Sequence, residues 1–107
     1  MADYSELIAV ELGGGVQTAI PAAGIAAGSA GTYTLNICND SDAAAAIDAI
    51  CITKGGAPVA ADKVHPAFTI EPRGWAAIQP IKLGEGWKVF VTSSAAVSAQ
   101  LIGRKEG

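Results

Sequence analysis

The sequence predicts an all-β fold: an antiparallel β-sandwich of a jelly-roll-like kind with about eight short strands. Three observations lead to this prediction. Short apolar runs recur at intervals of roughly 8–12 residues, several of them with period-2 alternation. Clusters of Gly, Pro, Asn and Ser separate the runs. The chain has 107 residues, which predicts a single domain over residues 1–107 with one core.

Four strands are expected in the first half of the chain. The ranges are 4–12, 16–20, 32–38 and 43–53. The first alternates apolar and mixed positions, although Ser5 as a cap leaves a helix open as an alternative. Residues 1–12 as a whole are predicted to form an edge strand or an arm, which the triple glycine at 13–15 ends. Residues 21–31 form an uncharged Ala/Gly/Ser loop, with a short strand around Ile25 as an alternative.

Four further strands are expected in the second half. A loop at 54–64 precedes them, and turns at 72–74, 84–86 and 93–94 separate them. The predicted ranges are 68–71, 75–81, 87–91 and 97–102. The last two alternate clearly, which favours strands with one buried face.

Composition excludes several function classes. The net charge is −3 and only 16% of residues are charged, against about 25% in typical domains. No basic run is present, so nucleic-acid binding is not expected. No apolar stretch reaches the ~20 residues of a membrane helix, and the N-terminus lacks the features of a signal peptide, so synthesis in the cytoplasm is expected. Much of the 50% hydrophobic content is alanine, which indicates a thin core that benefits from association with other subunits.

No residue pattern indicates catalysis, a metal site or a cofactor. The single histidine, His65, is expected in a surface loop and has no nucleophile or metal partner in its motif. The Asp40-Ser41-Asp42 run begins like a calcium loop, but alanines follow where Gly and Glu are needed. We therefore expect these side chains to shape a turn. No catalytic, metal-binding or cofactor-binding residue is predicted.

The two cysteines are predicted to be free thiols. Cys38 ends one strand and Cys51 lies within the next. A disulfide between them is conceivable only if those strands pair directly. We favour two free, mostly buried thiols, as is usual in a reducing compartment.

Candidate contact residues lie in the N-terminal segment and just after two turns. Trp75 and Trp87 each follow a turn glycine, and tryptophan is enriched at interfaces. Packing at the rim of the core is the alternative for both. An exposed tryptophan can also stack on a sugar, although the sequence shows no cluster of polar partners around either one. The candidates are Tyr4, Leu7, Trp75 and Trp87.

From about Ala19 onward, short motifs at turn and core positions recur in a definite order. The first half carries Leu35-Asn36-Ile37-Cys38-Asn39 after Ile20-Pro21-Ala22. The second half carries Leu83-Gly84-Glu85-Gly86, then Val89-Phe90-Val91, Ser94, Val97-Ser98-Ala99 and Gly103. This order resembles a family of small β-sandwich proteins in the particles of tailed bacteriophages, and that family has no catalytic motif to transfer.

The resemblance implies a non-enzymatic structural protein of the virion. A free-standing domain with low charge suits a capsid decoration, or cement, protein that binds the major capsid protein or other virion proteins. A homo-oligomer is then expected, with a trimer favoured. A neck, collar, tail or fibre module is the alternative. A carbohydrate- or cell-surface-binding module that uses Trp75 or Trp87 is a further alternative, which rests on the tryptophans and not on the resemblance.

Overall fold

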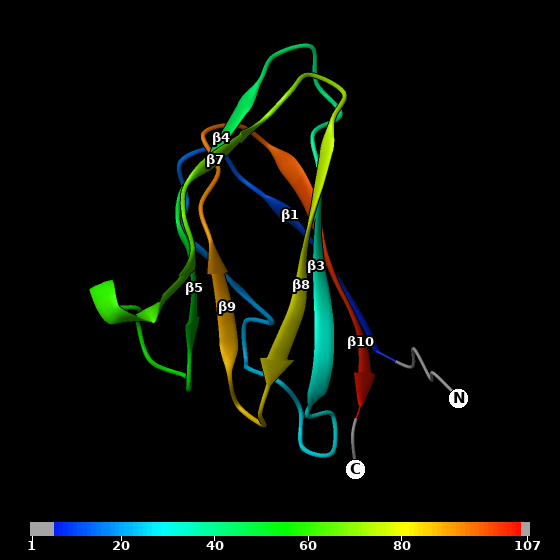
Figure 1. Cartoon of the computed structure of the whole chain (residues 1–107), viewed down its shortest axis with the longest axis vertical. Helices are drawn as coiled ribbons and strands as arrows, with labels where there is room; N and C mark the ends of the chain where they lie inside the picture. Colours follow the sequence, from blue (N-terminus) through cyan, green and yellow to red (C-terminus); the bar gives the residue numbers. More distant parts are fainter. Residues whose placement is uncertain (1–5, 106–107) are drawn as a thin grey trace.

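The computed structural model describes the backbone of residues 6–105 and the side chains of residues 8–103 other than Ala60. Two four-stranded antiparallel sheets form the two layers (Figure 1). The first has the order β1 (Glu6–Leu12), β10 (Val97–Lys105), β3 (Gly31–Cys38) and β8 (Trp75–Leu83). The second has the order β2 (Thr18–Ile20), β9 (Lys88–Val91), β5 (Ile50–Thr53) and β6 (Lys63–His65). A two-stranded sheet of β4 (Ala45–Ile47) and β7 (Phe68–Ile70) extends the fold at one end, and Ala60–Asp62 form one 3₁₀ turn.

The connectivity is that of a jelly roll. β4 and β5 are consecutive parts of one bent segment, and so are β6 and β7, which gives eight segments in chain order. The first then pairs with the eighth (β1–β10), the second with the seventh (β2–β9), the third with the sixth (β3–β8) and the fourth with the fifth. This nested pairing arises when one long antiparallel hairpin is rolled into two layers. The predicted all-β sandwich of jelly-roll-like kind is confirmed.

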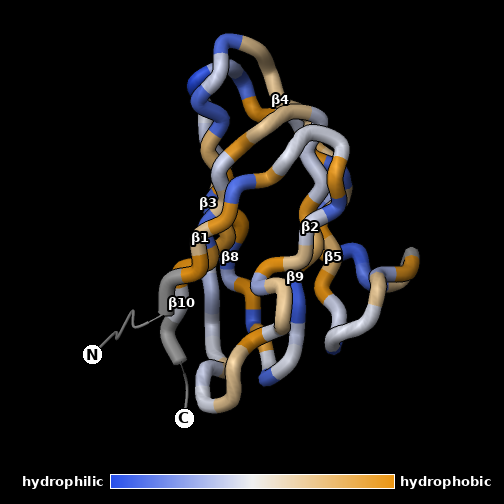
Figure 2. The backbone as a smooth tube through the Cα atoms, turned by 180° about the vertical axis from the view of Figure 1, so that it is seen from behind, coloured by the Kyte–Doolittle hydropathy of each residue, from blue (hydrophilic) through white to orange (hydrophobic). Residues whose placement is uncertain are grey.

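The core lies between the two sheets and follows the period-2 pattern. In β3 the burial alternates along the strand, with Tyr33, Leu35 and Ile37 facing inward. In β10 the inward residues are Val97, Ala99 and Leu101. Figure 2 shows the corresponding alternation of hydropathy along the strands. The remaining buried apolar residues are Leu12, Ile20, Ile25, Ala45, Ile47, Ile50, Cys51, Ile70, Ile81, Leu83, Val89 and Val91.

Several predicted elements differ from the structure. The helical alternative near Ser5 is wrong for the described part, because Glu6–Leu12 pair with β10 along their whole length as an edge strand. The predicted strand 43–53 is two strands, with the bend at residues 48 and 49. The predicted loop 54–64 contains a 3₁₀ turn and the start of β6. β6 was missed because this short edge strand has one apolar residue, Val64, and that residue is exposed.

The Ala-rich loop, residues 21–30, contains no strand at Ile25, so that alternative is wrong. Instead Ile25 is buried and its backbone bonds to the turn before β9: Ile25 N–H donates to Trp87 O (2.9 Å) and Gly86 N–H to Ile25 O (2.7 Å). Gly24 has φ of 86°, and a Cβ there would lie 2.5 Å from the Gly86 carbonyl oxygen. Glycine is therefore required where the loop meets this turn.

None of the described helical segments is long and apolar enough to cross a membrane.

Candidate functional site

The outer face of the sheet β1-β10-β3-β8 is the most distinctive exposed surface. Its register places side chains from all four strands in rows across the sheet. One row is Glu11, Ser98, Cys38 and Trp75. The next row is Ala9, Gln100, Asn36 and Ala77. Alternation puts these residues opposite to the core-facing positions, so residues far apart in the sequence share one surface.

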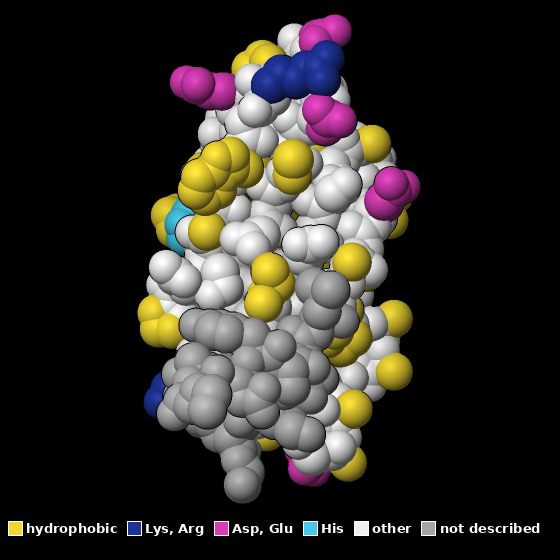
Figure 3. Space-filling view, turned by 90° about the vertical axis from the view of Figure 1, so that its right-hand side faces the viewer, with side chains coloured by type: hydrophobic (Ala, Val, Ile, Leu, Met, Phe, Trp, Pro, Cys, Tyr) yellow, Lys and Arg dark blue, Asp and Glu magenta, His cyan; other side chains and the backbone are white. Residues whose placement is uncertain are grey.

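The described part of this face carries very little charge. Among its described side chains only Glu11 and Lys82 are charged, and they belong to edge strands at opposite corners. Between them lie hydroxyl, amide and methyl groups, and Thr34 Oγ1 donates to Gln79 Oε1 at 3.0 Å. In the coloured part of Figure 3, which looks onto this face, charged side chains lie at the rim and the upper end, and white and yellow atoms lie between them. A surface of this kind favours neutral partners over ionic ones.

Trp75 stands beside a shallow groove on this face. Its side chain is 74% exposed, although tryptophan is usually well buried. The groove has a volume of about 430 Å³ and is lined by Asn36, Ile37, Cys38, Trp75, Ser98 and Gln100. The side chains of Asn36, Ser98 and Gln100 make no hydrogen bond within the described part of the chain. The groove therefore combines an aromatic face with free neutral donors and acceptors.

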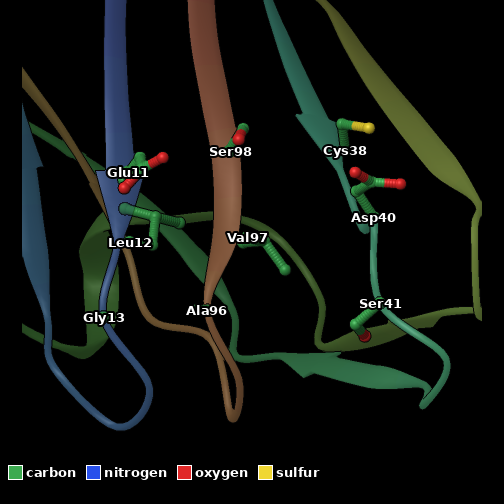
Figure 4. A pocket seen from close by; sticks show the side chains of 9 residues that line it. All are labelled: Glu11, Leu12, Gly13, Cys38, Asp40, Ser41, Ala96, Val97 and Ser98. Atoms are coloured by element: carbon green, nitrogen blue, oxygen red, sulfur yellow. The ribbon is translucent and has the colours of Figure 1, made fainter.

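A second hollow continues from this groove toward β1. Its volume is about 360 Å³, and it shares Cys38 and Ser98 with the first. Figure 4 shows Glu11, Ser98 and Cys38 on three neighbouring strands, with Asp40 and Ser41 on the segment after β3. Glu11 and Asp40 are the two carboxylates of its lining, and Asp40 is paired with Arg73, so Glu11 is the carboxylate that borders the neutral groove without a cationic partner within the described residues.

Trp87 differs from Trp75 in its surroundings. It is half-buried and packs against the core cluster. Lys54 Nζ lies 5.8 Å from the centre of its ring, within the range of a cation–π contact. These contacts are those of the rim-packing alternative, and a contact of Trp87 with a partner stays a prediction. Tyr4 and the side chain of Leu7, the other candidate contacts, lie outside the described residues.

The segment Asp40-Ser41-Asp42 is joined by ion pairs to Arg73 in the turn before β8. Arg73 Nη1 lies 2.9 Å from Asp40 Oδ1, and Arg73 Nη2 lies 2.8 Å from Asp42 Oδ1. The hydrogen bonds that Arg73 donates to Asp42, and then to Asp40, raise the pKa of its guanidinium. All three side chains are exposed, so these pairs contribute little to stability. No group of three or more His, Cys, Asp or Glu side chains suited to a metal occurs among the described residues.

His65 was predicted to lie in a surface loop, and this prediction is wrong, because His65 is the last residue of β6. Its side chain is half-buried, and its ring packs edge-on against Phe68 with centroids 4.9 Å apart. Nδ1 lies 2.7 Å from the carbonyl oxygen of the adjacent Pro66. These contacts are those of a packing residue at the start of the bend into β7.

Both cysteines are free thiols and lie in different sheets. Cys51 is buried as predicted, but the prediction is wrong for Cys38, which is exposed. The reason is register: Cys38 follows Ile37 and so falls on the outer face.

This difference predicts selective alkylation. We expect iodoacetamide to modify Cys38 rapidly in the folded protein and Cys51 only after unfolding, because a buried thiol is out of reach of the reagent. Peptide mapping by mass spectrometry over time measures both rates. A Cys38→Ser variant should show no rapid phase. Equal alkylation rates at both thiols would contradict the different exposure of Cys38 and Cys51. An intact mass two hydrogens lighter than the reduced chain would indicate a disulfide and would contradict the free thiols.

The sequence indicated Trp75 but missed its polar neighbours. Asn36, Ser98 and Gln100 lie on β3 and β10, and only the pairing of these strands with β8 brings them to Trp75. In the sequence, these three residues show only that they occupy the polar positions of alternating strands. That pattern does not reveal which strands lie next to one another in the sheet.

Comparisons of the chain with protein-family models, with curated proteins and with solved structures returned no significant match. Functional inference therefore depends on the fold and its surfaces.

Proposed function

We propose that this chain is a non-enzymatic structural protein of a tailed-bacteriophage particle, a capsid decoration protein that reinforces the shell. Two considerations support this. The motifs at its turns and core resemble those of small virion β-sandwich proteins. The eight-segment jelly roll is a fold used in viral capsid domains, although lectins and cupins share it and fold alone does not decide function.

The observation that carries the proposal is the surface of the Ala-rich loop. Ala22, Ala23, Ala26 and Ala27 are exposed, and no residue from 12 to 39 is charged. In Figure 2 the tube of the Ala-rich loop, residues 21–30, is pale to light orange, without the strong blue of hydrophilic residues. The loop therefore presents exposed methyl groups and no charge of its own, with the carboxylate of Glu85 beside it at Gly28. Such a methyl-rich surface at one end of a domain is suited to packing against a neighbouring subunit.

This loop is also anchored to the fold. Besides the two bonds of Ile25, Gly28 N–H donates to Glu85 Oε1 (2.9 Å), and Gly24 N–H donates to Pro21 O (2.9 Å) within the loop itself. Tyr33 Oη donates to Ser29 O at 2.6 Å. Docking such a loop costs less conformational entropy than ordering a free one. Each contact is small, and reinforcement comes from many copies across the shell.

In this proposed function the chain binds the major capsid protein or other virion proteins. It acts as a homo-oligomer such as a trimer. It is made in the host cytoplasm and becomes part of the virion.

The test is attachment to particles. Ala26→Glu should lower the occupancy of this chain on decoration-free particles about tenfold or more, because a carboxylate buried without a partner costs several kcal/mol. Ala67→Glu is the matched control, since Ala67 is exposed between β6 and β7, away from the loop. Co-sedimentation with quantitative mass spectrometry measures copy number. Absence from purified particles, presence in only a few copies as in a neck or fibre, or equal attachment of both variants would refute the decoration function.

A further inference from the structure

The groove beside Trp75 is separate from the Ala-rich loop. The loop precedes Gly31 at the start of β3, whereas Cys38 and its neighbour Trp75 are at the other end. At about 3.3 Å per residue, the eight residues of β3 separate the two surfaces by about 25 Å. If the loop binds a capsid shell, the groove lies at the end of the sheet that is farther from the shell. Binding of the loop to the shell therefore does not account for the groove.

We propose that this groove binds a neutral saccharide. The first argument is the exposed indole of Trp75. An aromatic face left in water is a costly surface, and it is matched by ligands that present flat C–H groups, as one side of a pyranose ring does. Ala77, the next outward residue on the same strand, is small and leaves the indole unobstructed in that direction.

The second argument is the chemistry around the indole. Asn36 and Gln100 occupy adjacent positions in one row and carry primary amides, each with donors and an acceptor. Ser98 adds a hydroxyl in the row of Trp75. None of the three is engaged within the described part of the chain, so all are available to sugar hydroxyls, which also both donate and accept.

The third argument is charge. Among the residues that the structure describes, no cationic side chain lines the groove, so a phosphate, a sulfate or a nucleic acid finds no counter-charge from them. The neighbouring hollow contributes the carboxylate of Glu11, which repels anions and can accept hydrogen bonds from hydroxyls, whereas its other carboxylate, Asp40, is paired with Arg73. A neutral polyhydroxylated ligand satisfies these conditions, and the neighbouring hollow offers room for a second sugar unit.

Size is consistent with this ligand. The groove volume of about 430 Å³ falls within the range of roughly 300–1,000 Å³ for small-molecule sites. The groove is shallow and its lining residues belong to the paired strands β10, β3 and β8, so we expect binding without rearrangement of the backbone. A site of this form suits the end or side of an oligosaccharide chain better than a buried single sugar.

The experiment uses the full chain on an array of neutral and sialylated oligosaccharides that includes the tetramers of cellulose, chitin and starch. Isothermal titration calorimetry then gives Kd for each neutral hit. Trp75→Ala should raise Kd about tenfold or more, as loss of a central aromatic contact does. Asn36→Ala and Gln100→Ala should each raise Kd a few-fold. Val64→Ala, at an exposed apolar residue in the other sheet, should leave Kd unchanged.

A second measurement localises the ligand. Because Cys38 lines the groove and is exposed, a saturating amount of the bound oligosaccharide should slow its alkylation by iodoacetamide. Absence of any neutral hit, an unchanged Kd in Trp75→Ala, or no protection of Cys38 would overturn the proposal. So would attachment to particles that depends on Trp75, since the groove would then be a protein interface. Attachment that depends only on Ala26 leaves the decoration function intact whatever the array shows.

Discussion

Replacing Gly103 with alanine is expected to destabilise the fold by about 3 kcal/mol, the upper part of the range for overpacking a core. Gly103 lies in β10 directly opposite Tyr33 in β3, and both face the interior. A Cβ at Gly103 would overlap the Tyr33 ring. The ring has little freedom to move, because it is 1% exposed and its hydroxyl donates to Ser29 O.

Urea unfolding of the full chain measures this effect. For a domain of about 100 residues each kcal/mol lowers Tm by about 4–8 °C, so a large thermal shift should accompany it. Gly56→Ala is the matched control, since a Cβ there meets nothing within 4 Å. In the double variant Gly103→Ala with Tyr33→Leu the penalties should not add, because the smaller side chain vacates the overlapped space. A Gly103→Ala protein with wild-type stability would show that the aromatic ring does not lie over this glycine.

The sequence predicted those parts of the fold that depend on local pattern. The inward residues of β3, β9 and β10 follow from alternation, and the structure confirms them. The bend between β4 and β5 was missed, because Ile47 and Ile50 are both buried and the run reads as one apolar strand. The bend is fixed by a distant contact, Asp48 N–H to Thr92 O at 2.9 Å, which no local pattern contains.

The candidate site was only partly predictable for the same reason. Trp75 after a turn glycine is a local signal, whereas its neutral neighbours come from strands 37 and 23 residues away, at Cys38 and Ser98. Neighbours of this kind depend on the pairing order of the jelly roll. That order depends on which long-range pairings bury the most apolar surface, and local propensity does not reveal it.

Replacing Asn39 with alanine is expected to destabilise the fold by about 2–3 kcal/mol, because it leaves buried polar groups without partners. Asn39 is fully buried between the turn after β3 and the turn after β7. Its Nδ2 donates to the carbonyl oxygens of Ala43 (2.8 Å), Glu71 (3.1 Å) and Ile70 (3.2 Å). Its Oδ1 accepts from the Ser41 hydroxyl at 2.7 Å.

The Asn39→Asp variant separates this hydrogen-bond role from simple packing. A carboxylate of nearly the same shape would face three carbonyl oxygens, so at pH 7 this variant should be less stable than Asn39→Ala. Burial and the facing oxygens raise the folded-state pKa of the new carboxyl above its unfolded value of about 3.9. The added penalty is then full above the folded-state pKa and disappears as pH falls toward 4. Urea unfolding at pH 7 and pH 4 measures the difference, with Asn36→Ala on the outer sheet face as the control near wild-type stability. Equal stability of the Asp and Ala variants at both pH values would mean that the Asn39 side chain is solvated and does not join the two turns.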